Sequence, residues 1–175
     1  MRNLTPLQAT AAPTTHLLIV NHQQLLHWIL NDGHMAFEEL RADSARRAVR
    51  QHDEALIYAT ADCFRGSARG KVIALATVTS AVRTLEQPVT FQARRFVAGC
   101  SLRVHGLAPY GEGVDLRGLV PDLGIFRGHS SWGVRLRRPF ATASPRDADL
   151  IRRDLQPFLR PYGATIGGYD IHGGA

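Results

Sequence analysis

Two strand-forming runs joined by a short basic turn constrain the fold of this chain more than any other feature. The runs 54–61 (EALIYATA) and 70–82 (GKVIALATVTSAV) are rich in Ile, Val, Tyr and Thr, and the turn 65–70 (RGSARG) lies between them. Such runs, bounded by Gly and Ser, predict strands connected by a hairpin loop. The run 93–107 (ARRFVAGCSLRVHGL) predicts a further pair of strands with a kink at Gly99. The middle of the chain is therefore predicted to form a mainly antiparallel sheet.

Helices are predicted early in the chain. After a short buried strand at 16–21 (HLLIVN), the apolar residues of 22–31 (HQQLLHWILN) recur at helical spacing. Gly33 is suited to end that helix in a left-handed conformation. A connecting segment at 35–40 and a second small helix at 42–51 complete this region.

A final helix is predicted at 144–159 (SPRDADLIRRDLQPFL), with Ser144 as its N-cap and Pro145 as its first residue. Helices near both ends of a strand-rich middle, without strand–helix alternation, indicate the α+β class. The expected architecture is a small, mainly antiparallel β-barrel with flanking helices.

The length of 175 residues suits one domain with a substantial core. Residues 1–15 are small and polar, with proline, and predict a flexible N-terminal arm. Residues 161–175 are glycine-rich and predict a flexible tail, which leaves a single domain at 16–160.

The positive charge of the chain is carried almost entirely by arginine. Lys and Arg number 21 against 15 acidic residues, the isoelectric point is about 10.1, and Lys71 is the one lysine. Because guanidinium is a planar fork that matches phosphates and base edges, this balance favours a nucleic acid or another polyanion as partner. A coding bias from Lys to Arg would give the same composition without a ligand.

Several classes of protein are disfavoured by the pattern of special residues. Cys63 and Cys100 lie far apart, and the eight histidines show no ligand spacing, so we predict neither a metal site nor a cofactor. No N-terminal apolar stretch and no long apolar run is present. We therefore expect a cytoplasmic protein without a membrane partner; its oligomeric state is left open.

The stretch 127–138 (RGHSSWGVRLRR) resembles a serine nucleophile motif at first sight. A nucleophile elbow needs a second small residue where Trp132 stands, and a helix where the following residues alternate like a strand. We therefore expect a strand, with Trp132 facing inward and Arg135 and Arg137 facing outward.

In order and spacing, the segments of this chain resemble the EVE family of the PUA-like superfamily, small barrels related to the YTH and ASCH domains. The similar segments are LLIVN with LLHWIL, HDEALIYAT, GKVIALATVTSAV, and the closing run LVPDLGIFRGHSSWGVRLRRPFATASPRDADLI. Together they cover about residues 16–157. Two positions depart from the family pattern: His22 follows Asn21 where a proline is common, and His52 precedes Asp53 where a glycine is expected.

This resemblance implies a pocket that binds a flipped, often modified, base of DNA or RNA without catalysing a reaction on it. Aromatic groups would surround the base and polar groups would contact its edge. The residues that we expect in this base pocket are Asn21, Trp28, Tyr58, Thr60 and Trp132. Four of these residues have a simpler alternative: core packing for the two tryptophans and Tyr58, and a helix N-cap for Asn21.

Arginines near the pocket are expected to hold the nucleic-acid backbone. The expected contacts are Arg65, Arg69, Arg135, Arg137 and Arg138. Two other functions remain open: an ASCH-like enzyme, either a ribonuclease or an amidohydrolase, and an accessory subunit that binds an acidic protein. Cys63, His105, His129 and Ser130 have no spacing that demands catalysis, and Lys71 or His129 would matter for turnover in the enzyme alternative.

Overall fold

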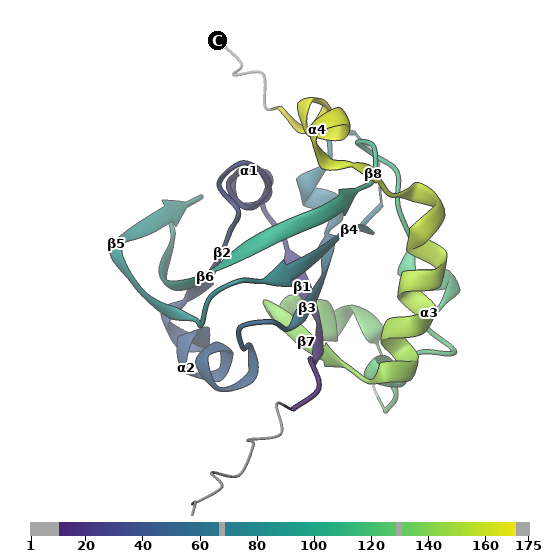
Figure 1. Cartoon of the computed structure of the whole chain (residues 1–175), viewed down its shortest axis with the longest axis horizontal. Coiled ribbons are helices and arrows are strands. Elements are labelled where there is room, and N and C mark those ends of the chain that lie inside the picture. The colour runs from purple at the N-terminus through teal and green to yellow at the C-terminus, as the bar shows by residue number, and fades with distance from the viewer. Residues whose placement is uncertain (1–10, 67–68, 129–130, 171–175) are drawn as a thin grey trace, which may run out of the picture.

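A curled sheet of eight strands forms a half-barrel with helices on both faces (Figure 1). The computed structural model describes residues 11–66, 69–128 and 131–170. The strands are β1 (Thr15–Val20), β2 (His34–Glu38), β3 (Glu54–Ala59), β4 (Lys71–Val78), β5 (Arg83–Phe91), β6 (Arg94–Leu107), β7 (Phe140–Ala143) and β8 (Arg160–Pro161). The helices are α1 (Gln23–Asp32), α2 (Glu39–Ala48), α3 (Pro145–Leu155) and α4 (Tyr162–Thr165). The predicted α+β class is confirmed.

The sheet runs in the order β2-β6-β4-β3-β1-β7, and β5 and β8 also pair with β6. Its pairs are antiparallel except for β1 and β3, which are parallel. β6 pairs with β2 and β5 through its first half and with β4 and β8 through its second half. The predicted pair of strands at 93–107 is therefore wrong: one strand changes partners along its length.

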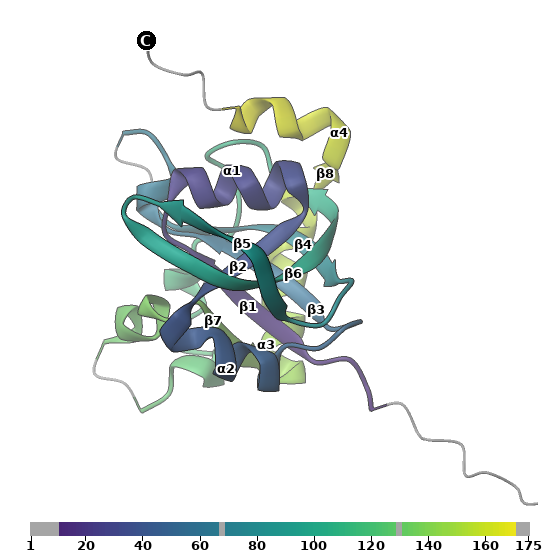
Figure 2. The same cartoon turned by 90° about the vertical axis from the view of Figure 1, so that its left-hand side faces the viewer.

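The central strands β1, β3 and β4 are buried on both faces of the sheet, which explains their nearly continuous apolar runs. In β1, Leu18 and Val20 belong to a core under α1 and α2, whereas Leu17 and Ile19 belong to a second core under α3. Figure 1 shows α3 on the opposite side of the sheet from α1 and α2, and Figure 2 shows the β5–β6 hairpin between those two helices.

Local signals placed α1 and the start of α3 correctly, although α3 ends at Leu155 and not at the predicted Leu159. α1 ends at Gly33, which has a φ of 65° and whose N–H donates to the carbonyl of Ile29. α3 begins with Pro145, and the Ser144 hydroxyl accepts a hydrogen bond from the N–H of Asp147 at 3.1 Å. Both helix ends thus follow the capping chemistry that the sequence predicted.

The segment predicted as a connection at 35–40 contains most of a strand. β2 buries Met35, Ala36 and Phe37 in succession and pairs with β6. Three adjacent buried side chains show no alternation, so the two-residue period that identifies a half-buried strand was missing. The helix predicted at 42–51 starts earlier, at Glu39, and ends at Ala48.

The strand predicted around Trp132 is also wrong. Trp132–Arg137 form a 3-10 helix, and strand pairing begins only at Phe140. Gly133 weakens a strand and Pro139 cannot donate to a ladder, so the sheet resumes after the proline. Val134, which would face inward together with Trp132 in a strand, is 49% exposed.

The tail was predicted as flexible, yet its first part is folded. Residues 161–170 include α4 and a 3-10 helix, Ile166–Tyr169. The hydroxyl of the buried Tyr169 donates to the carbonyl of Ala108 at 2.7 Å, and the hydroxyl of Tyr162 donates to the carbonyl of Leu30. Two aromatic anchors thus outweigh the glycine content. Residues 171–175, and residues 1–10 of the predicted arm, lie outside the described residues.

A buried polar corner fixes the start of β3. Asp53 accepts hydrogen bonds from the N–H groups of Thr14 and Arg50 and from Nε2 of His16, at 3.0, 2.9 and 2.8 Å. Burial opposes ionisation of Asp53, but these donors outweigh it and hold the pKa of its carboxyl below its ordinary value. His52 has a φ of 75°, the left-handed region that explains the glycine expected there by resemblance.

No helix in the described residues is both long enough and apolar enough to cross a bilayer.

Candidate functional site

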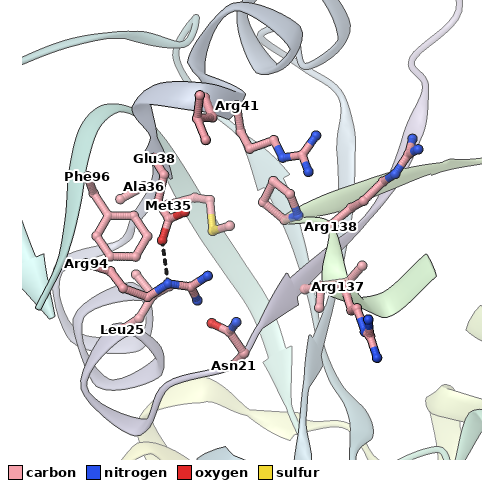
Figure 3. Close-up of a pocket in the computed structure, with 13 residues that line it drawn as sticks. Asn21, Leu25, Met35, Ala36, Glu38, Arg41, Arg94, Phe96, Arg137 and Arg138 are labelled. Atoms are coloured by element: carbon pink, nitrogen blue, oxygen red, sulfur yellow. Dashed lines mark ion pairs between the residues drawn. The ribbon is translucent and has the colours of Figure 1, made fainter. Parts of the chain in front are cut away.

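A cavity of about 250 Å³ opens between the end of β1, the start of α1, β2 and the first turn of α2 (Figure 3). We call it the arginine cavity. It is lined by Ile19, Asn21, Leu25, Met35, Ala36, Glu38, Leu40, Arg41, Arg94, Phe96, Arg137, Arg138 and Pro139. Its volume lies just below the range of about 300–1,000 Å³ that holds drug-sized ligands, so it suits a single heterocycle.

The floor of the arginine cavity is apolar and rigid. Leu25, Met35 and Phe96 are buried and belong to the core under α1 and α2. Because these residues come from α1, β2 and β6, the wall is fixed by packing rather than by a loop. A planar apolar face inserted here would contact a phenyl ring and a thioether.

One arginine of the cavity is held by a network of side chains. Nε of Arg94 pairs with the Glu38 carboxylate at 2.7 Å, and its Nη1 lies 3.1 Å from Nε2 of His22. Nδ1 of His22 lies 2.6 Å from Oε1 of Gln92. Because Arg94 can only donate, Nε2 of His22 accepts and Nδ1 carries the proton that goes to Gln92. Figure 3 shows the Arg94 guanidinium turned toward the cavity.

Three other arginines stand at the mouth without a counter-charge. Within the described residues, Arg41, Arg137 and Arg138 form no ion pair or hydrogen bond through their side chains. Figure 3 shows Arg41 directed over the opening, whereas Arg137 and Arg138 point outward from the rim. The mouth therefore offers guanidinium donors to an anion without breaking an existing pair.

Asn21 supplies the neutral polar group of the cavity wall. It follows β1 directly, and Figure 3 shows its carboxamide directed into the cavity. The expected N-cap alternative is wrong, because the N-cap of α1 is His22, whose side chain makes no cap hydrogen bond. The amide has no hydrogen bond to any described residue, so its donor and its acceptor are both available.

The predicted convergence of the two tryptophans is wrong. Trp28 packs against the rings of His34 and Phe91, with centroids 5.7 and 5.9 Å apart, on the core under α1. Trp132 packs against Phe126 at 5.8 Å on the core under α3. They lie on opposite faces of the sheet, and neither lines the arginine cavity. The error followed from the assumed strand around Trp132.

Tyr58 and Thr60 also lie away from the cavity lining. Tyr58 is buried in the core under α3, where burial first and Asp115 second raise the pKa of its hydroxyl to about 12. The core alternative holds for this residue. The N–H of Thr60 donates to the carbonyl of Val20 at 2.8 Å, which brings its backbone beside Asn21, but its side chain does not reach the cavity.

The predicted backbone arginines divide into two groups. Arg65 and Arg69 lie in the loop after β3, where the N–H of Arg65 donates to the Tyr110 hydroxyl and Arg69 pairs with Asp115 at 3.8 Å. Neither lines the arginine cavity. Arg137 and Arg138 do line it, and Arg135 lines a neighbouring cavity with Arg138.

Sequence reasoning missed two of the four arginines of the cavity. Arg41 comes from α2 and Arg94 from the start of β6. Neither belongs to a cluster or motif, and the pairing of Arg94 with Glu38 depends on the β2–β6 ladder. That ladder is a non-local contact that no local pattern indicates.

The thiols and imidazoles considered above as reactive groups are buried or hydrogen-bonded where the structure describes them. Burial raises the pKa of both thiols, Cys63 and Cys100, to about 12, so neither is a thiolate at neutral pH. His105 is hydrogen-bonded to Thr77 at 2.7 Å. His129 and Ser130 lie outside the described residues. In the ranges that the structure describes, no group of three or more His, Cys, Asp or Glu is placed to bind a metal.

Comparison with known proteins supports the fold and leaves the function open. No family model matches the sequence, and no curated protein matches it. Among solved structures, a hypothetical protein from Leishmania major is similar (14% identity, TM-score 0.54, 81% of this chain and 93% of that chain). A protein of Rhodopseudomonas palustris solved by NMR (14%, 0.50, 82% and 94%) and one from Pseudomonas putida (13%, 0.54, 79% and 97%) are also similar. At these identities the likeness shows the half-barrel fold alone.

Proposed function

We propose that this chain is an EVE-type barrel that binds DNA or RNA without chemistry and holds an extruded, modified base in the arginine cavity. The observation that carries the proposal is the Asn21 carboxamide directed into a cavity of about 250 Å³ whose mouth is lined by Arg41, Arg137 and Arg138, which are unpaired within the described residues. A heterocycle joined to phosphates is a ligand that needs both kinds of group.

The cavity wall provides the contacts that a base requires. The Asn21 carboxamide can donate and accept at once, as an amide does when it pairs with a base edge. Phe96 and Met35 line the cavity with the small part of each side chain that is exposed, and so give the ring a limited apolar contact. The same apolar floor suits a small substituent such as a methyl group, which is the reason to propose a modified base.

The mouth of the cavity provides the contacts that the backbone requires. Arg41, Arg137 and Arg138 have no carboxylate partner in the described residues, and the whole chain carries a net charge of +6. Leu40, 92% exposed, stands beside Arg41 at the opening. An exposed apolar side chain at this place can contact a base next to the extruded one.

The test is binding of fluorescein-labelled short single strands, with and without one methylated base, measured by anisotropy over a salt series. Asn21→Ala is expected to weaken binding about tenfold and to remove the preference for the modified base, since a good bidentate base contact contributes about 1–3 kcal/mol. The matched control is Arg153→Ala. Arg153 lies on α3, on the other side of the sheet from the arginine cavity, and its side chain pairs with Asp154.

The proposal is refuted if Asn21→Ala and Arg153→Ala bind equally well. It is also refuted if the wild-type protein does not bind any of the strands at low salt. Loss of binding in Arg41→Ala without change in Asn21→Ala would show a polyanion surface with no base site.

A further inference from the structure

A second cavity, of about 440 Å³, adjoins the arginine cavity along β7 and α2. It is lined by Arg41, Ser44, Ile125, Arg135, Arg138, Pro139, Phe140, Ala141 and Thr142. We call it the phosphate cavity. We infer that it binds the phosphodiester next to the base in the arginine cavity, so that the ligand is an oligonucleotide rather than a free nucleoside. The inference rests on the proposed function and names the part of the ligand beyond the base.

The charge of the phosphate cavity is entirely positive. Arg41, Arg135 and Arg138 contribute three guanidinium groups, and no Asp or Glu is in the lining. Like charges held together without carboxylates repel one another, and an anion between them removes that repulsion. A phosphodiester carries one negative charge at neutral pH.

Arg135 gives an independent sign of a missing acceptor. Its Nε is buried and has no hydrogen-bond partner among the described residues. A buried, unpartnered donor on a charged group is costly, so an acceptor is expected at this position. Nε itself is covered by neighbouring atoms, so the Arg135 side chain must turn for a phosphate oxygen in the cavity to accept from this N–H and from a terminal nitrogen in the bidentate arrangement that arginine favours.

The hydroxyl groups of the cavity are already partnered. The Ser44 hydroxyl donates to the carbonyl of Arg41 at 3.1 Å, and the Thr142 hydroxyl lies 3.1 Å from Nδ1 of His16. The guanidinium groups therefore provide the free donors, and a monoanionic phosphodiester, which has acceptors only, matches them.

The two cavities adjoin each other. Arg41, Arg138 and Pro139 line both of them. A strand whose base lies in the arginine cavity would therefore cross Arg138 to bring its next phosphate to Arg135. Base, then phosphate, is the order of groups along a nucleic-acid strand.

The experiment uses a tetranucleotide with one base among abasic sugars, so that the base fixes the register. Each of its linkages is replaced in turn by an uncharged methylphosphonate, and binding to the full-length wild type and to Arg135→Ala is measured. Replacement of one linkage next to the base is expected to weaken binding to the wild type about tenfold to a hundredfold. The same replacement should leave binding to Arg135→Ala almost unchanged, because that variant has already lost the contact.

Arg135→Lys, which keeps the charge and loses the fork, is expected to recover less than half of the lost binding free energy. Arg46→Ala, on α2 but paired with Asp43, is the matched control and should leave the effect of every linkage unchanged. Thermal unfolding of each variant identifies any loss of binding that is due to loss of fold.

The outcomes separate this inference from the proposed function. If replacement of each linkage has the same effect on binding to the wild type and to Arg135→Ala, the phosphate cavity does not bind a phosphodiester, even when Asn21→Ala still weakens binding. If Arg135→Ala weakens binding of a wholly abasic strand while Asn21→Ala changes nothing, the phosphate cavity binds the backbone and the proposed base site is refuted.

Discussion

Removal of the Asp53 carboxylate is expected to destabilise the fold strongly, independently of any ligand. The carboxylate is buried and accepts hydrogen bonds from the N–H groups of Thr14 and Arg50 and from Nε2 of His16, which is itself 1% exposed. Asp53→Ala leaves all three donors without a partner. An unsatisfied buried group costs about 1–3 kcal/mol, and two of the three hydrogen bonds are only partly buried, so the free energy of unfolding should fall by about 3 kcal/mol.

Asp53→Asn gives the intermediate case, because its amide oxygen can still accept from two donors while its NH₂ faces the third. Its expected loss is about 1–3 kcal/mol. The assay is urea unfolding followed by tryptophan fluorescence. Asp43→Ala is the control: its side chain is 79% exposed and, among the described residues, pairs only with Arg46, so the substitution should cost less than about 0.5 kcal/mol. Equal unfolding free energies for Asp53→Ala and Asp43→Ala would refute this account of the corner.

The same carboxylate sets a pH dependence with a definite sign. The pKa of Asp53 is lower in the folded protein than in the unfolded chain, so the folded state favours the ionised form. The stabilisation is fully present above the unfolded pKa, about 4, and is lost as the pH falls through the folded value. The difference in unfolding free energy between wild type and Asp53→Asn should therefore shrink below about pH 4.

Three further predictions concern the backbone and the thiols. His52→Gly should raise the free energy of unfolding by about 0.5–1 kcal/mol, because relief of the strained φ of 75° gains about 1–2 kcal/mol and the added freedom of glycine in the unfolded chain costs about 0.4–1 kcal/mol; urea unfolding measures the difference. Gly99→Ala should lower it by about 1–3 kcal/mol because a Cβ there overlaps the β2 backbone, whereas Gly118→Ala, with nothing near its Cβ, should be neutral in the same assay. The thiols of Cys63 and Cys100, with pKa values near 12, should resist iodoacetamide in the folded protein and react in urea, as mass spectrometry would show; rapid alkylation of the folded chain would contradict their burial.

Helices whose capping residues lie close by in the sequence could be predicted, whereas strands that depend on pairing with another strand could not. The caps of α1 and α3 lie within a few residues of each helix, so the sequence contains the whole signal. β5 has mostly exposed side chains and no apolar period, and its place in the sheet depends on β6. A strand held by its partner's backbone leaves little trace in its own side chains.

The site was predicted in part, for the same reason. Asn21 lies directly after a strand that the sequence indicated, and Arg137 and Arg138 belong to an evident basic stretch. Arg41 and Arg94 join them only through the folding of α2 against the β2–β6 ladder. The expected aromatic lining depended on a strand at 132–137 that the structure replaces with a 3-10 helix.

The most direct test of the central claim is a ¹⁵N NMR titration with a methylated nucleoside monophosphate, following the side-chain N–H signals. The Asn21 amide, assigned through Asn21→Gln, should shift in a saturable manner, because it lines the cavity. The indole N–H signals of Trp28 and Trp132, which lie outside that lining, should stay in place. Shifts of the indoles with an unchanged Asn21 amide would contradict the claim that the base is held in the arginine cavity.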